Sequence, residues 1–103
     1  MIEIISMRKY HRVHDYDFRV DRSTSIGNPF PMKSESEEER NRVCDKFEDY
    51  FTELITREVV TEYLQQMFDA YRLHGKLRLF CWCAPKRCHA ETIRKYLERK
   101  IGK

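Results

Sequence analysis

The sequence predicts a small α/β domain in which helices are layered against a short sheet. Three patterns lead to this class. Residues 16–21 alternate apolar and charged side chains with the two-residue period of a half-buried strand. Apolar side chains recur every three to four positions over 43–54 and again over 60–71, which is typical of amphipathic helices. Residues 77–83 are apolar on both faces after their first positions, which predicts a buried central strand.

Length and composition favour a single folded domain that spans residues 1–103. Hydrophobic residues make up 41% of the chain, and it has only three glycines and three prolines, which excludes collagen-like and disordered sequences. The longest apolar run, residues 79–85, is far shorter than the roughly 20 residues of a membrane span. The amino terminus has an early acid and no small-residue cleavage site, so we expect no secretory peptide and a cytoplasmic location.

The first third of the chain is expected to form two strands and a long loop. A short strand begins at Ile2, and we expect it to lie beside the strand at 16–21. The polar residues 8–15 between them fit either a connecting loop or the tip of a hairpin. Residues 23–33 contain one glycine and two prolines, which break strand ladders and fix turns, so this segment is predicted to be an irregular loop.

Three helices complete the predicted order β-β-loop-α-α-β-α. Two overlapping capping boxes within residues 34–39 place acids in the first turn of a helix, where the helix dipole favours them. The second helix is predicted to end at Gly75, which supplies a left-handed cap. A last helix follows Pro85 and carries lysines and arginines in its final turns.

Basic residues are concentrated in the last third of the chain. Residues 1–33 carry a net charge of +2, residues 34–72 of −6 and residues 73–103 of +7. A basic surface attracts phosphate, nucleic acid or an acidic protein, although these charges can equally pair with the acidic middle segment. The last helix has a basic face that is either solvated or binds a host protein or nucleic acid, formed by Arg94, Lys95, Arg99, Lys100 and Lys103.

The segment 81–89, which joins the predicted central strand to the last helix, carries the strongest candidate site. Ligands of open α/β sheets bind outside the carboxyl ends of strands, and a helix amino terminus attracts anions. Lys86 and Arg87 add two positive charges there. Such surroundings also favour the thiolate form of cysteine, so Cys83 or Cys88 is a candidate nucleophile.

Three interpretations of this segment stay open. The cysteines can simply be buried, because cysteine is common in protein cores. They can bind Zn²⁺ as part of the set Cys81, Cys83, Cys88 and His89. Alternatively, residues 81–89, where the central strand turns into the last helix, form a corner that holds a small anionic ligand, such as a nucleotide or sugar phosphate. In that case Cys83, Cys88 or His89 would perform any chemistry. The sequence identifies neither a cofactor nor an oligomeric state.

Residues 22–31 form a second candidate segment. Gly27 permits a close backbone approach, and Asn28 precedes a proline, which favours extended geometry that would turn its amide outward. The segment can also be no more than a rigid turn. If it folds over the end of the central strand, five donors share one pocket, namely Arg22, Ser23, Asn28, Lys86 and Arg87.

The two segments together resemble a known family. The string GNPF at 27–30 and the string CWCAPKRCH at 81–89 are similar to motifs of small phage and bacterial proteins that carry domain of unknown function 4326. The chain departs from that pattern at Ile26, where an aromatic is expected, and at Ala90, where glycine is expected. The resemblance implies a compact, often phage-encoded α/β domain with no established activity. We therefore expect a nucleotide-like or phosphate-bearing ligand at the junction of the two motifs, and no membrane association.

Overall fold

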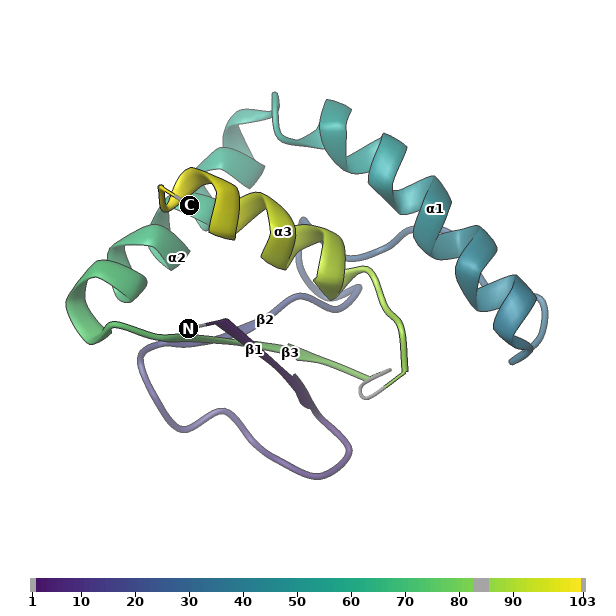
Figure 1. Ribbon diagram of the computed structural model, residues 1–103, viewed down its shortest axis with the longest axis horizontal. Coiled ribbons are helices and arrows are strands. Elements are labelled where there is room, and N and C mark those ends of the chain that lie inside the picture. The colour runs from purple at the N-terminus through teal and green to yellow at the C-terminus, as the bar shows by residue number, and fades with distance from the viewer. Residues whose placement is uncertain (1, 83–85, 103) are drawn as a thin grey trace.

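Three parallel strands form a sheet with the order β1-β3-β2. The computed structural model describes residues 2–82 and 86–102, and its strands are β1 (Ile2–Ser6), β2 (Asp17–Arg19) and β3 (Leu77–Cys81). The helices are α1 (Glu37–Leu54), α2 (Glu58–His74) and α3 (Ala90–Lys100), so the predicted α/β class and element order are confirmed (Figure 1). The predicted central strand is β3, which ends at Cys81 instead of residue 83.

The expected pairing of the first two strands is wrong, because β3 lies between them. β1 pairs with one edge of β3, and β2 pairs with the other. Residues 7–16 are therefore a connecting loop and not the tip of a hairpin, which would need antiparallel neighbours. In this order the apolar β3 has hydrogen-bonding partners along both edges, whereas the more polar β2 is short and lies at the edge.

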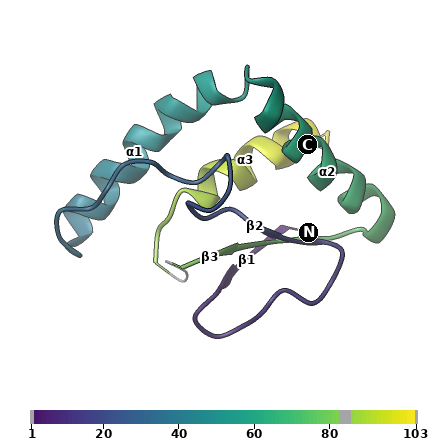
Figure 2. The ribbon, with the colours of Figure 1, turned by 180° about the vertical axis from the view of Figure 1, so that it is seen from behind.

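All three helices cover one face of the sheet, and the loop 7–16 lies on the opposite side (Figures 1 and 2). The core between sheet and helices includes Phe47 of α1, Met67 of α2 and Leu97 of α3, all fully buried in one cluster with Leu79. Strand residues alternate between faces, so the neighbouring Phe80 points to the other side. It is also fully buried there, which explains why both faces of β3 are apolar.

The helix ends follow the predicted capping signals. The hydroxyl of Ser36 accepts a hydrogen bond from the backbone N–H of Glu39 at 3.2 Å, so α1 begins at the second of the two capping boxes. Gly75 ends α2 in the left-handed conformation, with φ of 74°. Residues 20–36 form the predicted irregular loop and run alongside α1 (Figure 2). Within residues 2–82 and 86–102, no helix is both long and apolar enough to cross a membrane.

Candidate ligand-binding site

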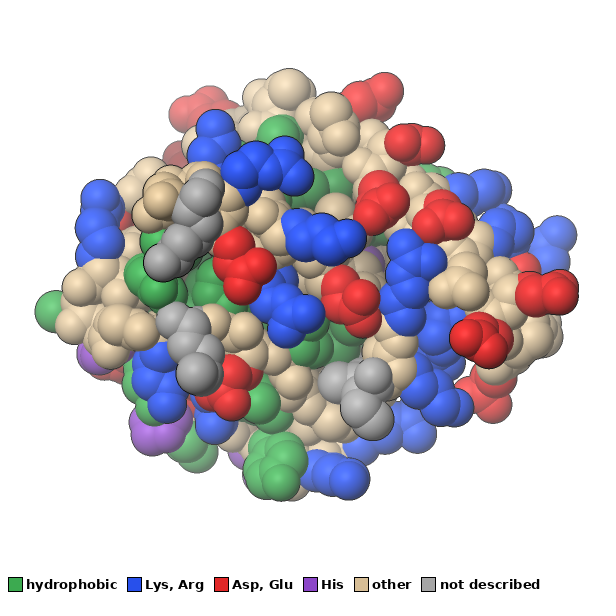
Figure 3. Space-filling view, viewed as in Figure 1, with side chains coloured by type: hydrophobic (Ala, Val, Ile, Leu, Met, Phe, Trp, Pro, Cys, Tyr) green, Lys and Arg blue, Asp and Glu red, His purple; other side chains and the backbone are tan. Residues whose placement is uncertain are grey.

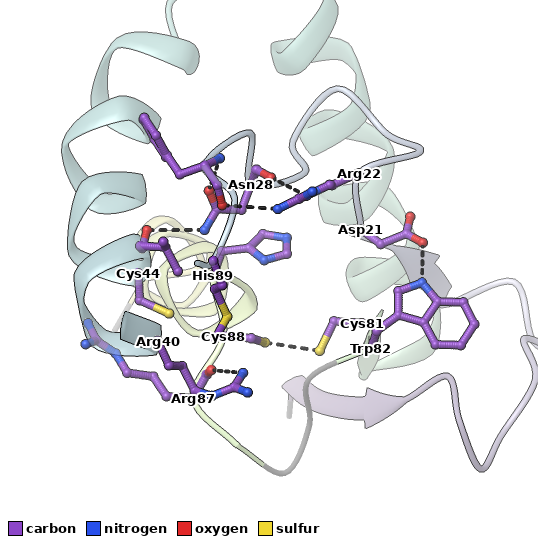
Figure 4. Close-up of a pocket in the computed structure, with 13 residues that line it drawn as sticks. Asp21, Arg22, Asn28, Arg40, Cys44, Cys81, Trp82, Arg87, Cys88 and His89 are labelled. Carbon is purple, nitrogen blue, oxygen red and sulfur yellow. Dashed lines mark hydrogen bonds between the residues drawn. The ribbon is translucent and has the colours of Figure 1, made fainter. Parts of the chain in front are cut away.

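The carboxyl ends of the parallel strands meet at one edge of the sheet. β2 leads into Asp21 and Arg22, and β3 leads into Trp82. Cys88 and His89, which directly precede α3, lie beside them (Figure 4). This is the edge at which open α/β sheets bind ligands.

A cavity of about 350 Å³ lies at this edge, and we call it the strand-end pocket. Both segments singled out in the sequence line it, with Arg22, Asn28 and Phe30 from the first and Cys81, Trp82, Arg87, Cys88 and His89 from the second (Figure 4). The helix α1 adds Arg40, Val43 and Cys44. A largely apolar lining with a few polar groups is the composition of a small-molecule site.

The amide of Asn28 points into the protein, so the expectation that it turns outward is wrong. Its Nδ2 donates to the carbonyl of Val43 at 3.2 Å, and its Oδ1 accepts from the N–H of Phe30 at 2.9 Å. A buried amide needs such partners, and the α1 backbone supplies one of them. Asn28 therefore ties the loop to α1 and shapes the pocket wall.

Arg22 holds the same loop from the other side. Its Nε donates to the carbonyl of Asn28 at 3.0 Å, and its Nη2 donates to the carbonyl of Phe30 at 3.1 Å. Both acceptors are neutral, so these bonds orient the guanidinium without cancelling its charge. Arg22 thus reaches the pocket as a positioned cation.

Asp21 is the centre of a hydrogen-bond cluster at the pocket mouth. Its carboxylate accepts from the Trp82 indole N–H at 2.9 Å, from the Ser23 hydroxyl at 2.6 Å, and from the Arg19 guanidinium. Burial raises the pKa of Asp21, but the hydrogen bonds from Arg19, Ser23 and Trp82 outweigh it and lower the pKa to about 2. The ionised carboxylate therefore fixes the Trp82 ring, which is 47% exposed.

Ser23 and Lys86 do not line the strand-end pocket, contrary to expectation. The Ser23 hydroxyl and N–H are both directed at Asp21, so this residue supports the carboxylate. Lys86 is exposed and faces an adjoining recess. The pocket therefore obtains its charge from other residues.

Arg87 lines the pocket but is already engaged. Its Nη2 donates to the carboxylate of Asp45 at 2.9 Å, which raises the pKa of Arg87, and its Nη1 donates to Asn41 at 3.0 Å. These bonds anchor the corner to α1. Arg87 is thus a weaker anion ligand than expected from its place in the sequence.

Arg40 is the pocket cation that sequence reasoning missed. It lies in the acidic middle segment, whose net charge of −6 conceals it. In the fold it reaches the corner, where its Nη1 donates to the carbonyl of Arg87 at 3.4 Å. The α3 amino terminus contributes less than expected, because the N–H groups of Glu91 and Thr92 already donate to the carbonyls of Cys88 and His89.

His89 is a buried, neutral imidazole in the pocket wall. Its Nε2 contacts the carbonyl of Val20, and because a carbonyl only accepts, this nitrogen carries the proton. Burial lowers the pKa of His89 and outweighs the opposing effect of that hydrogen bond. The ring also packs edge-on against Phe47, with centroids 5.0 Å apart. The remaining nitrogen, Nδ1, can accept a proton or a ligand N–H.

The lowered pKa of His89 predicts a pH-dependent stability. The unfolded chain binds a proton near pH 6.5 while the folded chain does not, so stability falls as the pH drops below about 6.5, by up to about 1.4 kcal/mol per pH unit. Urea unfolding between about pH 5 and pH 7.5 should show this slope, and it should be shallower in His89→Gln. The exposed His74 provides the matched variant, His74→Gln, and an equally shallow slope in that variant would contradict the assignment.

Three cysteines line the pocket and are buried, namely Cys44, Cys81 and Cys88. The sulfur atoms of Cys81 and Cys88 face each other at 3.1 Å (Figure 4). Cys83, the other candidate nucleophile, lies outside the described residues. The described residues contain no group of three or more side chains arranged to hold a metal. The interpretation of a four-donor zinc site needs Cys83, so it stays one of the open alternatives.

The basic face of α3 lies apart from the pocket. Its side chains Arg94, Lys95, Arg99 and Lys100 do not line the pocket, and the last three are exposed, while Lys103 is outside the described residues. Figure 3 shows acidic side chains among the basic ones over this helix. The helix therefore presents a mixed surface instead of a continuous basic one.

A small parallel α/β domain with a ligand-sized pocket at its strand ends is the structural class that these observations define. Residues 5–99 match the family described as Domain of unknown function (DUF4326), and because this is nearly the whole chain, the protein belongs to that family. The resemblance seen in the two motifs is thereby confirmed. No curated protein and no solved structure matches the chain.

Proposed function

We propose that this protein binds a nucleotide-like, phosphate-bearing small ligand in the strand-end pocket. The observation that carries the proposal is that described residues from two segments far apart in the sequence line one cavity, with Arg22, Asn28 and Phe30 from the first and Cys81, Trp82, Arg87, Cys88 and His89 from the second. The cavity lies at the sheet edge where such ligands bind in open α/β folds. A phage origin and action in the host cytoplasm, which the family resemblance suggested, belong to the same proposal.

The lining suggests how such a ligand would lie. Val43 and the three buried cysteines form an apolar floor for a base or sugar. The Trp82 indole, held by Asp21, offers a flat surface at the mouth, and stacking of a base on an aromatic ring contributes about 1–3 kcal/mol. Arg22 and Arg40 would hold the phosphate, because guanidinium groups bind its oxygens in pairs.

The pocket also contains groups that could act on a bound ligand. Cys88 offers a thiol and His89 a neutral imidazole in the same wall, and a nucleophile next to a base is the usual arrangement for covalent catalysis. Cys83 stays a candidate on the sequence alone. Binding is therefore proposed first, with turnover as a question for the purified protein.

Binding is tested most simply with the single tryptophan, Trp82, as a fluorescent reporter. We expect AMP, GMP, CMP or UMP to change its emission in a saturable way and to raise the melting temperature. A ligand at a hundredfold excess over its Kd adds about 2.7 kcal/mol of stability. Replacing the pocket cation in Arg40→Gln should weaken binding roughly tenfold, the loss of about 1.4 kcal/mol of charge-assisted contact.

Arg42→Gln is the matched control, because Arg42 lies on the same helix but pairs with Glu39 and does not line the pocket. Binding by this variant should stay within about twofold of the parent. If neither these four monophosphates nor the corresponding triphosphates bind at millimolar concentration, or if both variants bind as the parent does, the proposal is wrong.

A further inference from the structure

A second recess, of about 760 Å³, adjoins the strand-end pocket. The two cavities share Arg22, Met32, Arg40 and Trp82. A ligand seated in the pocket would therefore extend into this recess past the Trp82 ring. We call it the cationic recess, after its six basic side chains, which are Arg8, Lys9, Arg22, Lys33, Arg40 and Lys86.

Basic side chains outnumber acidic ones in the lining of the cationic recess. Glu35 is the single acidic residue among its described lining residues. Across residues 2–82 and 86–102, none of the six cations forms an ion pair within 4.0 Å, although five other arginines do. Figure 3 shows Lys and Arg side chains gathered at the lower right, where α1 begins and β3 ends, with acidic side chains at the outer edge of this region.

The six cations come from separate parts of the chain. Residues 8–9 follow β1, and Arg22 follows β2. Lys33 precedes α1, Arg40 lies near the start of that helix, and Lys86 belongs to the segment before α3. A run of lysines on one exposed helix is an ordinary solvated face, but this cluster is assembled by the fold. Like charges held together repel one another and lower stability unless an anion neutralises them.

We propose that the cationic recess binds the polyphosphate chain of a nucleotide, so that the ligand class is a nucleoside di- or triphosphate. This inference rests on the proposed function and specifies its ligand. A monophosphate in the strand-end pocket would contact Arg22 and Arg40 and leave the remaining four cations without a phosphate contact. Each further phosphate places negative charge among those four, so affinity rises with the number of phosphates and falls with added salt.

Calorimetric titration of the full-length protein with AMP, ADP and ATP, in low salt without divalent metal, tests this order. We expect ATP to bind at least about tenfold more tightly than AMP. The double variant Arg8→Gln, Lys86→Gln changes residues that line the recess but not the pocket, and it should weaken ATP binding about tenfold while changing AMP binding less than about threefold. The control Lys95→Gln, Arg99→Gln removes two charges from α3 and should change neither.

The outcomes separate this inference from the proposed function. If AMP and ATP bound with equal affinity and Arg40→Gln still weakened the binding of both, the polyphosphate site would be contradicted and the proposed nucleotide binding would stand. Failure of all three nucleotides to bind would contradict both. Tighter binding of a single-stranded oligonucleotide than of ATP, abolished by the same double variant, would assign the recess to nucleic acid and overturn the inference.

Discussion

Gly27→Ala is expected to destabilise the protein by about 3 kcal/mol. A Cβ at this position would lie 2.3 Å from the backbone oxygen of Asp21 and 2.5 Å from the Cα of Arg22. These are backbone atoms next to the end of β2, so they cannot move aside as a flexible side chain would. The loop would have to lift away, and with it the residues that form one wall of the pocket. Urea unfolding measures the loss directly.

Gly75→Ala is the matched control for this prediction. Gly75 has φ of 74°, and no heavy atom lies within 4 Å of the place that an alanine methyl group would occupy. The change therefore costs only the left-handed strain of about 1–2 kcal/mol. If Gly27→Ala proved no more destabilising than Gly75→Ala, this result would contradict the close packing of Gly27 against the backbone at the end of β2.

Asp21→Asn is expected to cost about 3 kcal/mol at neutral pH. The amide keeps the shape of the carboxylate but loses its charge and turns an NH₂ group toward one of the donors now bound. The indole of Trp82 would lose its fixed orientation, which should also alter its fluorescence. Asp69→Asn, at an exposed carboxylate on α2, is the control and should have a much smaller effect.

The pH dependence of the same variant provides a second readout. The pKa of Asp21 is lowered to about 2 in the folded protein, so the carboxylate stabilises the fold above about pH 4 and loses this effect as the pH falls toward 2. The stability difference between parent and Asp21→Asn should shrink by about 1–2 kcal/mol over this range, allowing for screening by solvent. A difference that does not change with pH would contradict the proposed role of the charge.

Local signals in the sequence predicted most of the fold. Apolar periodicity located the helices, Ser36 and Gly75 marked their ends, and the two-sided apolar pattern identified β3 as the central strand. These features depend on residues a few positions apart. The neighbours of β3 could not be predicted in the same way, because strand order depends on how the 7–16 loop crosses the sheet.

The sequence predicted that two motifs line one site, but it did not predict the partners of the individual side chains in that site. Asn28 turned inward because a carbonyl of α1, 15 residues away, accepts its amide proton. Arg87 is paired because α1 brings Asp45 to it, whereas Arg40 is hidden inside an acidic segment. Each of these outcomes depends on the placement of α1 over the corner. No local pattern around 27–30 or 81–89 contains that information.

The central claim is that residues 21–30 and the corner around β3 and α3 bind one ligand together. The most direct test is a two-dimensional ¹⁵N NMR titration of the labelled protein with ATP. We expect saturable shifts of the Trp82 indole N–H and of backbone amides in both segments, with one shared Kd. Shifts confined to the exposed basic face of α3, or no shifts at millimolar ATP, would contradict it.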